Sequence, residues 1–198
     1  MTCQELKNGS LLELAHKLVG EQLQPGSMVV DATLGNGHDA LFLAGCVGSE
    51  GKLYGFDIQQ EALDITRRRL NEAAINPSSY ELIGQSHSEM ARHISSKVQA
   101  VMFNLGYLPG GNKEIVTHKH FTTEAISSAL ALLSAGGILT VMCYPGHPGG
   151  AEEADLVMSK LDALDAHDYL VTCYRRAQSS VSAPFLCVVR DAKRPAPG

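Results

Sequence analysis

The feature that most restricts the fold is an alternation along the chain between short apolar runs and longer segments with helical spacing. Seven of the apolar runs are rich in Val, Ile, Leu, Tyr and Phe and have the length of strands. We predict strands at 28–33, 52–57, 80–84, 100–105, 138–143, 169–174 and 185–190, and helices at 11–23, 39–47, 61–74, 88–94, 122–133 and 151–164. The chain is therefore expected to be an α/β protein.

This alternation predicts a doubly wound, mostly parallel sheet, because parallel neighbours need crossover connections and the crossover helices cover both faces. The last two predicted strands are joined by a loop at 175–184, so the last strand should be antiparallel. We expect a seven-stranded Rossmann-like sheet in a single domain over 1–198. A helical N-terminal segment should cover about 1–24, and a flexible tail about 192–198.

The composition is that of a globular protein, with 44% hydrophobic and 19% charged residues. No apolar run is long enough to cross a bilayer and the first ten residues lack a signal-peptide pattern, so we expect a cytoplasmic protein with no membrane partner. The net charge of -5 disfavours sequence-independent clamping on a long nucleic acid, so any such contact should be local. The five cysteines form no C-x-x-C pair, which favours reduced thiols over disulfides or zinc.

A glycine-rich turn, Gly35-Asn36-Gly37, lies between the first of these strands and the helix that follows it. Small residues there let the backbone approach a ligand, and the start of the helix offers unpaired N–H groups. Asp57 ends the next strand, twenty positions after Gly37, a spacing that suits a carboxylate binding ribose hydroxyls. Together these residues predict an adenosine-containing ligand at the carboxyl ends of the strands.

Two cofactors compete for this site. Gly35 to Ala40 also fits G-x-G-x-x-A, the pattern of a nicotinamide dinucleotide enzyme. Asp31, inside the first of these strands, can receive a charged amino group, and nothing later in the chain resembles a dehydrogenase substrate domain. A sulfonium and an ammonium would suit Asp31 and Asp39, so we favour S-adenosylmethionine.

The segment "FNLGYLPGG", 103–111, ends the fourth strand with an amide, an aromatic ring and a rigid turn. In a doubly wound sheet this position is the topological switch point, beside a ligand held by the first two strands. We therefore predict that Asn104, Gly106 and Tyr107 face the group that reacts with the cofactor, and that Pro109 helps to shape their pocket. The Asn104 side-chain oxygen can accept a hydrogen bond from an amine.

Five segments, "VDATLGNGHDALFLA", "YGFDIQ", "FNLGYLPGGNKEIVT", "YPGH" and "APFLC", together resemble a family of small class I methyltransferases once labelled rRNA methylases. That family is associated with tRNA 5-aminomethyl-2-thiouridine methyltransferase activity in bacteria and plastids. The resemblance covers roughly residues 10 to 190. It implies methyl transfer from S-adenosylmethionine to the aminomethyl nitrogen of the wobble uridine, with the anticodon region of tRNA as partner and a homodimer left open.

By position, the resemblance implies a cofactor loop at Asn36, Gly37 and Asp39, with Gly35 beside it. It also implies an adenosine end at Asp57 and Gln59, an adenine-side loop at Ser86 and His87, a methyl-transfer lip at Asn104, Leu105, Gly106 and Tyr107, and substrate-side residues at Tyr144 and His147. We interpret Asn104 and Tyr107 as the catalytic pair and His87 as a hydrogen-bonding loop residue. An unstacked base would be read by stacking on Tyr107 or Tyr144.

The basic side chains and the histidines are weighed as phosphate contacts and as metal ligands. Lys113 and Lys119, with Arg175 and Arg176, are candidate phosphate contacts, whereas the run from Arg67 to Arg69 is interpreted as a solvated helix face. The histidine spacing matches no common zinc pattern, so no metal is expected. Two other functions stay open: methylation of another RNA or a small amine, and a non-catalytic module that binds S-adenosylmethionine or RNA.

Overall fold

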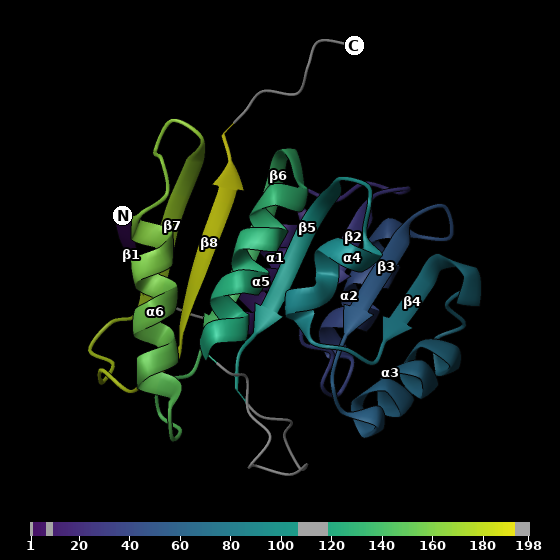
Figure 1. Ribbon diagram of the computed structural model, residues 1–198, viewed down its shortest axis with the longest axis horizontal. Helices are drawn as coiled ribbons and strands as arrows, with labels where there is room; N and C mark the ends of the chain where they lie inside the picture. Colours follow the sequence, from purple (N-terminus) through teal and green to yellow (C-terminus); the bar gives the residue numbers. More distant parts are fainter. Residues whose placement is uncertain (1, 7–9, 107–118, 193–198) are drawn as a thin grey trace.

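The computed structural model describes residues 2–6, 10–106 and 119–192, and the side chains of 10–106 and 121–192 (Figure 1). Within these residues eight strands form one sheet. The strands are β1 Thr2–Leu6, β2 Met28–Asp31, β3 Lys52–Phe56, β4 Tyr80–Ile83, β5 Val98–Asn104, β6 Leu133–Cys143, β7 Tyr169–Arg176 and β8 Phe185–Asp191. The α-helices are α1 Leu11–Gly20, α2 His38–Val47, α3 Gln60–Glu72, α4 Met90–His93, α5 Lys119–Leu132 and α6 Gly150–Asp162.

The strand order β1-β7-β8-β6-β5-β2-β3-β4 confirms the doubly wound sheet expected from the sequence. All seven predicted strands form, and β8 runs antiparallel to both β6 and β7 while the other pairings are parallel. The chain order reverses at β2, which pairs with β3 on one side and β5 on the other. The topological switch point therefore lies between β2 and β5, as predicted.

The start of the chain differs from the sequence prediction. Residues Thr2–Leu6 form a strand that pairs with β7, where a helical segment over 1–24 was expected. Helix α1 begins at Leu11, as predicted for the helix at 11–23, because Ser10 and Glu13 form a reciprocal capping box, and it ends at Gly20. The predicted helix at 88–94 is also shorter, since a 3₁₀ turn at His87–Glu89 precedes α4. Of the predicted tail at 192–198, all but Ala192 lies outside the described residues.

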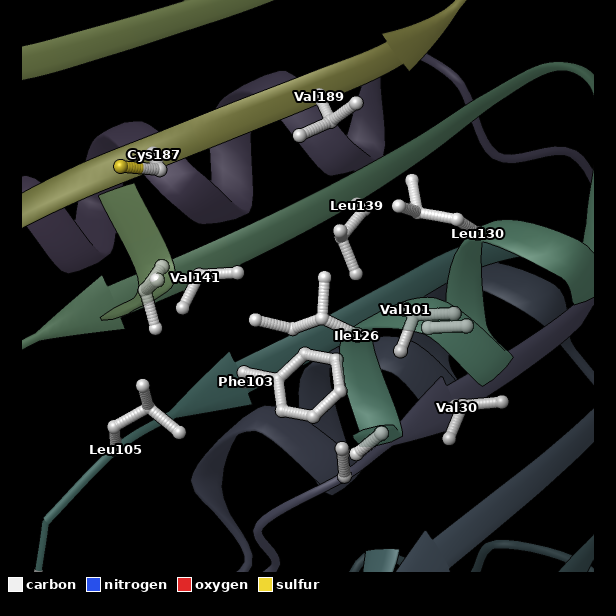
Figure 2. Packing of buried hydrophobic residues seen from close by; sticks show 14 of the residues in the cluster. Val30, Val101, Phe103, Leu105, Ile126, Leu130, Leu139, Val141, Cys187 and Val189 are labelled. Carbon is white, nitrogen blue, oxygen red and sulfur yellow. The ribbon is translucent and has the colours of Figure 1, made fainter. Parts of the chain in front are cut away.

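Alternate residues of the strands bury their side chains on opposite faces of the sheet. Val30 and Val101 pack under α4, α5 and α6, whereas Val29 and Ala100 pack under α1, α2 and α3. Figure 2 shows the first of these cores, in which Ile126 of α5 lies among Phe103, Val101 and other strand residues. Helices therefore cover both faces of the sheet.

The helices and the cysteines bear on two of the predictions made from the sequence. None of the helices in the described parts of the chain is long and apolar enough to cross a membrane. Four cysteines whose side chains are described, Cys46, Cys143, Cys173 and Cys187, carry free thiols, and the last three of these are buried. Cys173 and Cys187 lie opposite each other on β7 and β8, with their sulfur atoms 2.9 Å apart.

Candidate functional site

A cavity of about 740 Å³ lies where β2, β3, β4 and β5 end, beside the switch point. This volume is within the usual range for a small-molecule site. The structure brings these predicted site residues together in its wall: Gly35, Asn36, Asp39, Asp57, Gln59, Ser86, His87, Asn104, Leu105, Tyr144 and His147. Their segments are far apart in sequence, and the parallel sheet gathers them because parallel strands end at one edge.

The glycine-rich turn has the backbone that its sequence predicts. Gly35 and Gly37 have φ values of 49° and 73°, in the left-handed region that favours glycine. A Cβ atom on Gly37 would lie 2.9 Å from Cα of Thr66 in α3, which leaves no room for a side chain. Arg69 of α3 donates from Nε to the Asn36 carbonyl at 2.8 Å, so this arginine holds the turn and is not part of a solvated face.

Asp57 connects the glycine turn to the end of β3. Its two carboxylate oxygens accept hydrogen bonds from the backbone N–H groups of Gly35, at 3.0 Å, and Gln59, at 2.9 Å. Burial raises the pKa of the Asp57 carboxyl above its ordinary value, and these backbone hydrogen bonds oppose that shift. The carboxylate is thus fixed in the cavity wall with further lone pairs for a ligand hydroxyl.

Asp31 is fully buried at the end of β2. One of its oxygens accepts from the N–H of Thr33 at 3.1 Å, and the Ala40 backbone N–H also acts on this carboxyl, but no described group makes a well-formed hydrogen bond to Oδ2. Burial, and next the negative charge of Asp39, raise the pKa of Asp31 well above its ordinary value. A buried carboxyl with an unsatisfied oxygen is costly, and a bound cation beside it would remove that cost.

Asn104 ends β5 and is held at two points. Its backbone N–H donates to Oγ1 of Thr33 at 2.7 Å, and its side-chain Nδ2 donates to Oδ2 of Asp39 at 3.2 Å. Because a carboxylate only accepts hydrogen bonds, this contact assigns the amide nitrogen to the Asp39 side. The Asn104 Oδ1 is therefore the atom left free to accept a hydrogen bond from a group in the cavity.

His87 lies in the wall between β2 and β5. Its Nδ1 donates to the Ala32 carbonyl at 3.1 Å, and its ring packs edge-on against Phe103. Burial lowers the pKa of His87 to about 4, so the ring is neutral near pH 7. Its Nε2 is then an acceptor, buried and without a partner among the described residues. The preceding residue, Ser86, accepts from the Ser88 N–H and caps the 3₁₀ turn.

The opposite side of the cavity contains Tyr144 and His147, just beyond β6. Burial raises the pKa of Tyr144 to about 12, with a further contribution from the Asp39 charge, so its phenol is neutral. His147 donates from Nδ1 to the Pro148 carbonyl at 2.9 Å. Gly106 faces these two residues, since a Cβ atom on it would lie within 4 Å of both.

Several predicted residues cannot be placed from the structure. Tyr107, Pro109 and Lys113 lie outside the described residues, and so does the side chain of Lys119, the first residue of α5. Arg175 and Arg176 end β7, and the Arg175 guanidinium lies 3.8 Å from the centre of the Phe185 ring. The proposed phosphate contacts stay predictions.

Three residues that the sequence did not indicate also line the cavity: His16, Thr33 and Phe121. His16 is on α1, and its Nε2 lies 2.6 Å from Oδ1 of Asp39. Helical spacing with Leu12, another wall residue, places His16 on the inner face of α1, but a histidine at that spacing is not distinctive. Within the described parts of the chain, no cluster of three or more histidine, cysteine or acidic side chains is arranged to hold a metal.

Known proteins are similar to this chain in sequence and in fold. A family model described as "Putative rRNA methylase" matches residues 53–190. A chloroplastic tRNA (mnm5s2U34)-methyltransferase of Arabidopsis thaliana is 36% identical over 183 residues, which cover 88% of this chain and 66% of that protein. The chain thus spans about two thirds of the length of that relative.

Solved structures agree with the sequence matches. An rRNA methylase structure from Clostridium thermocellum has a TM-score of 0.90 at 36% identity and covers 94% of this chain and all of that one. A methyltransferase of Streptococcus mutans in complex with SAH has a TM-score of 0.84 at 32% identity, over 93% of this chain and 99% of that one. The resemblance inferred from the sequence is confirmed, and the chain belongs to the rRNA methylase family of class I, S-adenosylmethionine-dependent methyltransferases.

Proposed function

We propose that this protein transfers a methyl group from S-adenosylmethionine to the aminomethyl nitrogen of 5-aminomethyl-2-thiouridine at the wobble position of tRNA. The observation that carries the proposal is the orientation of Asn104, whose amide nitrogen is bound by Asp39 and whose oxygen is left as an acceptor at the cavity. The named tRNA methyltransferase relative supports the choice of substrate. The product would be 5-methylaminomethyl-2-thiouridine.

The residues around the glycine turn fit this cofactor. Asp57, fixed by two backbone N–H groups, is suited to ribose hydroxyls, and the unsatisfied oxygen of Asp31 is suited to the ammonium group. Gly37 lies against Thr66 with no space for a Cβ, which keeps the turn compact at the start of α2. When bound, the cofactor supplies an electrophilic methyl group on a sulfonium. The chain itself binds the cofactor and the acceptor, orients them and excludes water.

The side of the cavity around Asn104 suits a substrate atom that can donate a hydrogen bond, such as an amine nitrogen, and a ring carbon cannot do so. The Asn104 oxygen accepts a hydrogen bond from an amine N–H, which leaves the nitrogen lone pair to point elsewhere. The wall also presents two neutral groups, the ring of His87 and the phenol of Tyr144, which create no positive charge that would repel the cofactor. Tyr107 and Pro109 would complete this side, and Lys113 and Lys119 would contact phosphates.

The test is nucleoside mass spectrometry of aminomethyl-bearing tRNA after incubation with enzyme and cofactor, combined with an Asn104→Ala variant. We expect the wild type to add one methyl group to the wobble nucleoside. Asn104→Ala should lower the single-turnover rate by about ten- to a thousandfold, the usual effect of losing one well-placed polar contact. Its affinity for S-adenosylmethionine should change far less, because alignment matters only when nitrogen and methyl meet.

Asn71, an exposed asparagine at the end of α3, provides the matched control. Asn71→Ala should leave both the rate and the cofactor affinity unchanged. If Asn104→Ala folds, binds the cofactor and keeps full activity, Asn104 does not hold the substrate amine. A wild type that leaves the wobble nucleoside unmodified would reject the substrate.

Ribosomal RNA is the second candidate, because the family description names it. The same assay with ribosomal RNA in place of tRNA separates the two substrates. Methylation confined to ribosomal RNA would support this alternative and reject tRNA.

A further inference from the structure

We propose that His16 is the catalytic residue that accepts the proton of the substrate amine, with Asp39 holding its imidazole. This inference rests on the proposed function, since it concerns how an amine becomes reactive in the cavity. Neither the glycine turn nor the segment after β5 contains His16, which reaches the cavity from α1. It therefore adds an element to the site that the sequence motifs do not include.

The imidazole of His16 is fixed in place by two contacts from α2. Its Nε2 lies 2.6 Å from Oδ1 of Asp39, and its ring stacks on Phe42 with the centroids 4.1 Å apart and the planes 7° from parallel. The other oxygen of the same carboxylate accepts from Asn104. His16 and Asn104 thus contact the same carboxylate. The proposed base therefore lies next to the residue proposed to accept a hydrogen bond from the substrate amine.

The Asp39 contact also decides which nitrogen of His16 can act. A carboxylate accepts the hydrogen bond, so Nε2 carries the hydrogen and Nδ1 of a neutral ring keeps the lone pair. The His16 side chain is 30% exposed, so a proton taken at the cavity can pass on to water. Asp39 remains in direct contact with the ring throughout the step.

The reaction requires such a group. An alkyl ammonium has an ordinary pKa near that of lysine, about 10, so the substrate is mostly protonated at neutral pH and has no lone pair. In the proposed step the ammonium gives one proton to Nδ1 of His16. The nitrogen lone pair then forms the N–C bond, while the electron pair of the C–S bond stays on sulfur. The product leaves as a secondary ammonium, and His16 returns its proton to solvent.

Three other titratable groups at the cavity, His87, Tyr144 and His147, are less suited to this step. The pKa of His87, lowered to about 4 by burial, makes it a poor proton acceptor. Tyr144 would have to ionise first, and burial raises its pKa to about 12. The Nε2 atom of His147 is buried, so it lacks the route to solvent that the exposed part of His16 provides.

The experiment compares His16→Gln and His16→Ala in single-turnover methylation of aminomethyl-bearing tRNA, with calorimetric titration of S-adenosylmethionine on each variant. Glutamine can keep a hydrogen bond to Asp39 but has no basic nitrogen. We expect both variants to lose about 10²- to 10⁴-fold in rate, the range for a general base, with cofactor affinity within about threefold of wild type. Added imidazole should restore at least about tenfold of the rate of His16→Ala and none of the rate of Asn104→Ala.

Each result decides between the two roles of His16. Wild-type activity in His16→Gln, or no rescue of a folded His16→Ala by imidazole, would show that His16 is structural and would overturn the inference. A loss of cofactor affinity that equals the loss of rate would also overturn it, because His16 would then bind the cofactor. In all three cases an active wild type leaves the proposed function standing. Only an inactive wild type removes both.

Discussion

The two sides of the cavity are built in different ways. On the side proposed to bind the cofactor, called the cofactor side, backbone N–H groups of Gly35 and Gln59 bind the Asp57 carboxylate. On the side proposed to bind the methyl acceptor, called the acceptor side, three side chains from separate elements contact one another: His16, Asp39 and Asn104. The first side is therefore fixed by local backbone geometry, and the second exists only when α1, α2 and β5 have packed together.

This difference predicts which property each side controls. Changes on the cofactor side should alter S-adenosylmethionine affinity, and changes on the acceptor side should alter turnover. Thr33 joins the sides, because its hydroxyl oxygen accepts from the Asn104 backbone while its own N–H donates to Asp31. Variants of these residues therefore test whether S-adenosylmethionine affinity and turnover can be changed separately.

Among the variants that compare the two sides, the largest effect is expected for Asp57→Ala, which removes the proposed ribose acceptor and its hydrogen bond to the glycine turn. S-adenosylmethionine binding should weaken by about 2–4 kcal/mol, the value of one or two charge-assisted hydrogen bonds. Calorimetric titration measures this. Asp64→Ala, an exposed acid on α3, is the control and should bind normally. Unchanged affinity in a folded Asp57→Ala would take Asp57 out of the cofactor site.

The next effect concerns the pH dependence of stability at His87. Its pKa is about 4 in the folded protein and about 6.5 ordinarily, so the unfolded chain binds more protons between these values. The free energy of unfolding should thus fall as the pH drops from 6.5 to 4, by up to about 3 kcal/mol more than in His87→Gln. Urea unfolding of both proteins at several pH values measures the difference.

The His87 comparison is made between two variants because Asp31 and Asp57 work in the opposite direction. Their pKa values are raised by burial, so their protonation favours the folded state as the pH falls. Both proteins contain these acids, and their contribution cancels. Parallel pH profiles for wild type and His87→Gln would mean that His87 is not buried in the neutral form.

Thr33→Val tests whether the two sides are joined. Valine keeps the shape of threonine but leaves the Asn104 N–H without its 2.7 Å partner, at a cost of about 1–2 kcal/mol. We expect cofactor affinity and single-turnover rate to fall together, each by several-fold. A fall in only one of them would show that Thr33 belongs to a single side.

The smallest effect is expected for Tyr144→Phe, which removes only a neutral hydroxyl. Turnover should change by no more than about 1 kcal/mol, and S-adenosylmethionine affinity should stay constant. Since the pKa of Tyr144 is raised to about 12, the wild-type rate should also show no ionisation of this phenol up to about pH 10. A large loss in Tyr144→Phe would give the hydroxyl a direct part in the reaction.

The sequence predicts the cofactor side because its signals are local. Strand, glycine turn and helix follow one another, and the parallel sheet then places the ends of β2, β3, β4 and β5 at one edge. The rule that parallel strands end at the same edge of the sheet is enough to place Asp57 near Gly35. Their roles in binding stay predictions, but the cavity that the rule requires is present at the switch point.

The acceptor side could be predicted only in part. Asn104 follows from the switch point, but its contact with Asp39 crosses 65 positions and depends on the packing of β5 against α2. The helical spacing that places His16 on the inner face of α1 applies to several other residues of that helix. Its contact with Asp39 depends on where α1 lies in the fold. The strand β1 was missed for a related reason, because five residues carry little periodicity and their partner is β7.

The pairing of β1 with β7 has a consequence for folding. Thr2 lies opposite Thr172, so the first strand of the chain can join the sheet only after one of the last strands has formed. Contacts between residues so distant in sequence form slowly, because the loop between them must close first. Before β1 docks, β7 presents an open edge that can pair with another chain. Slow hydrogen exchange at the β7 amides that face β1 would therefore report that the sheet has closed.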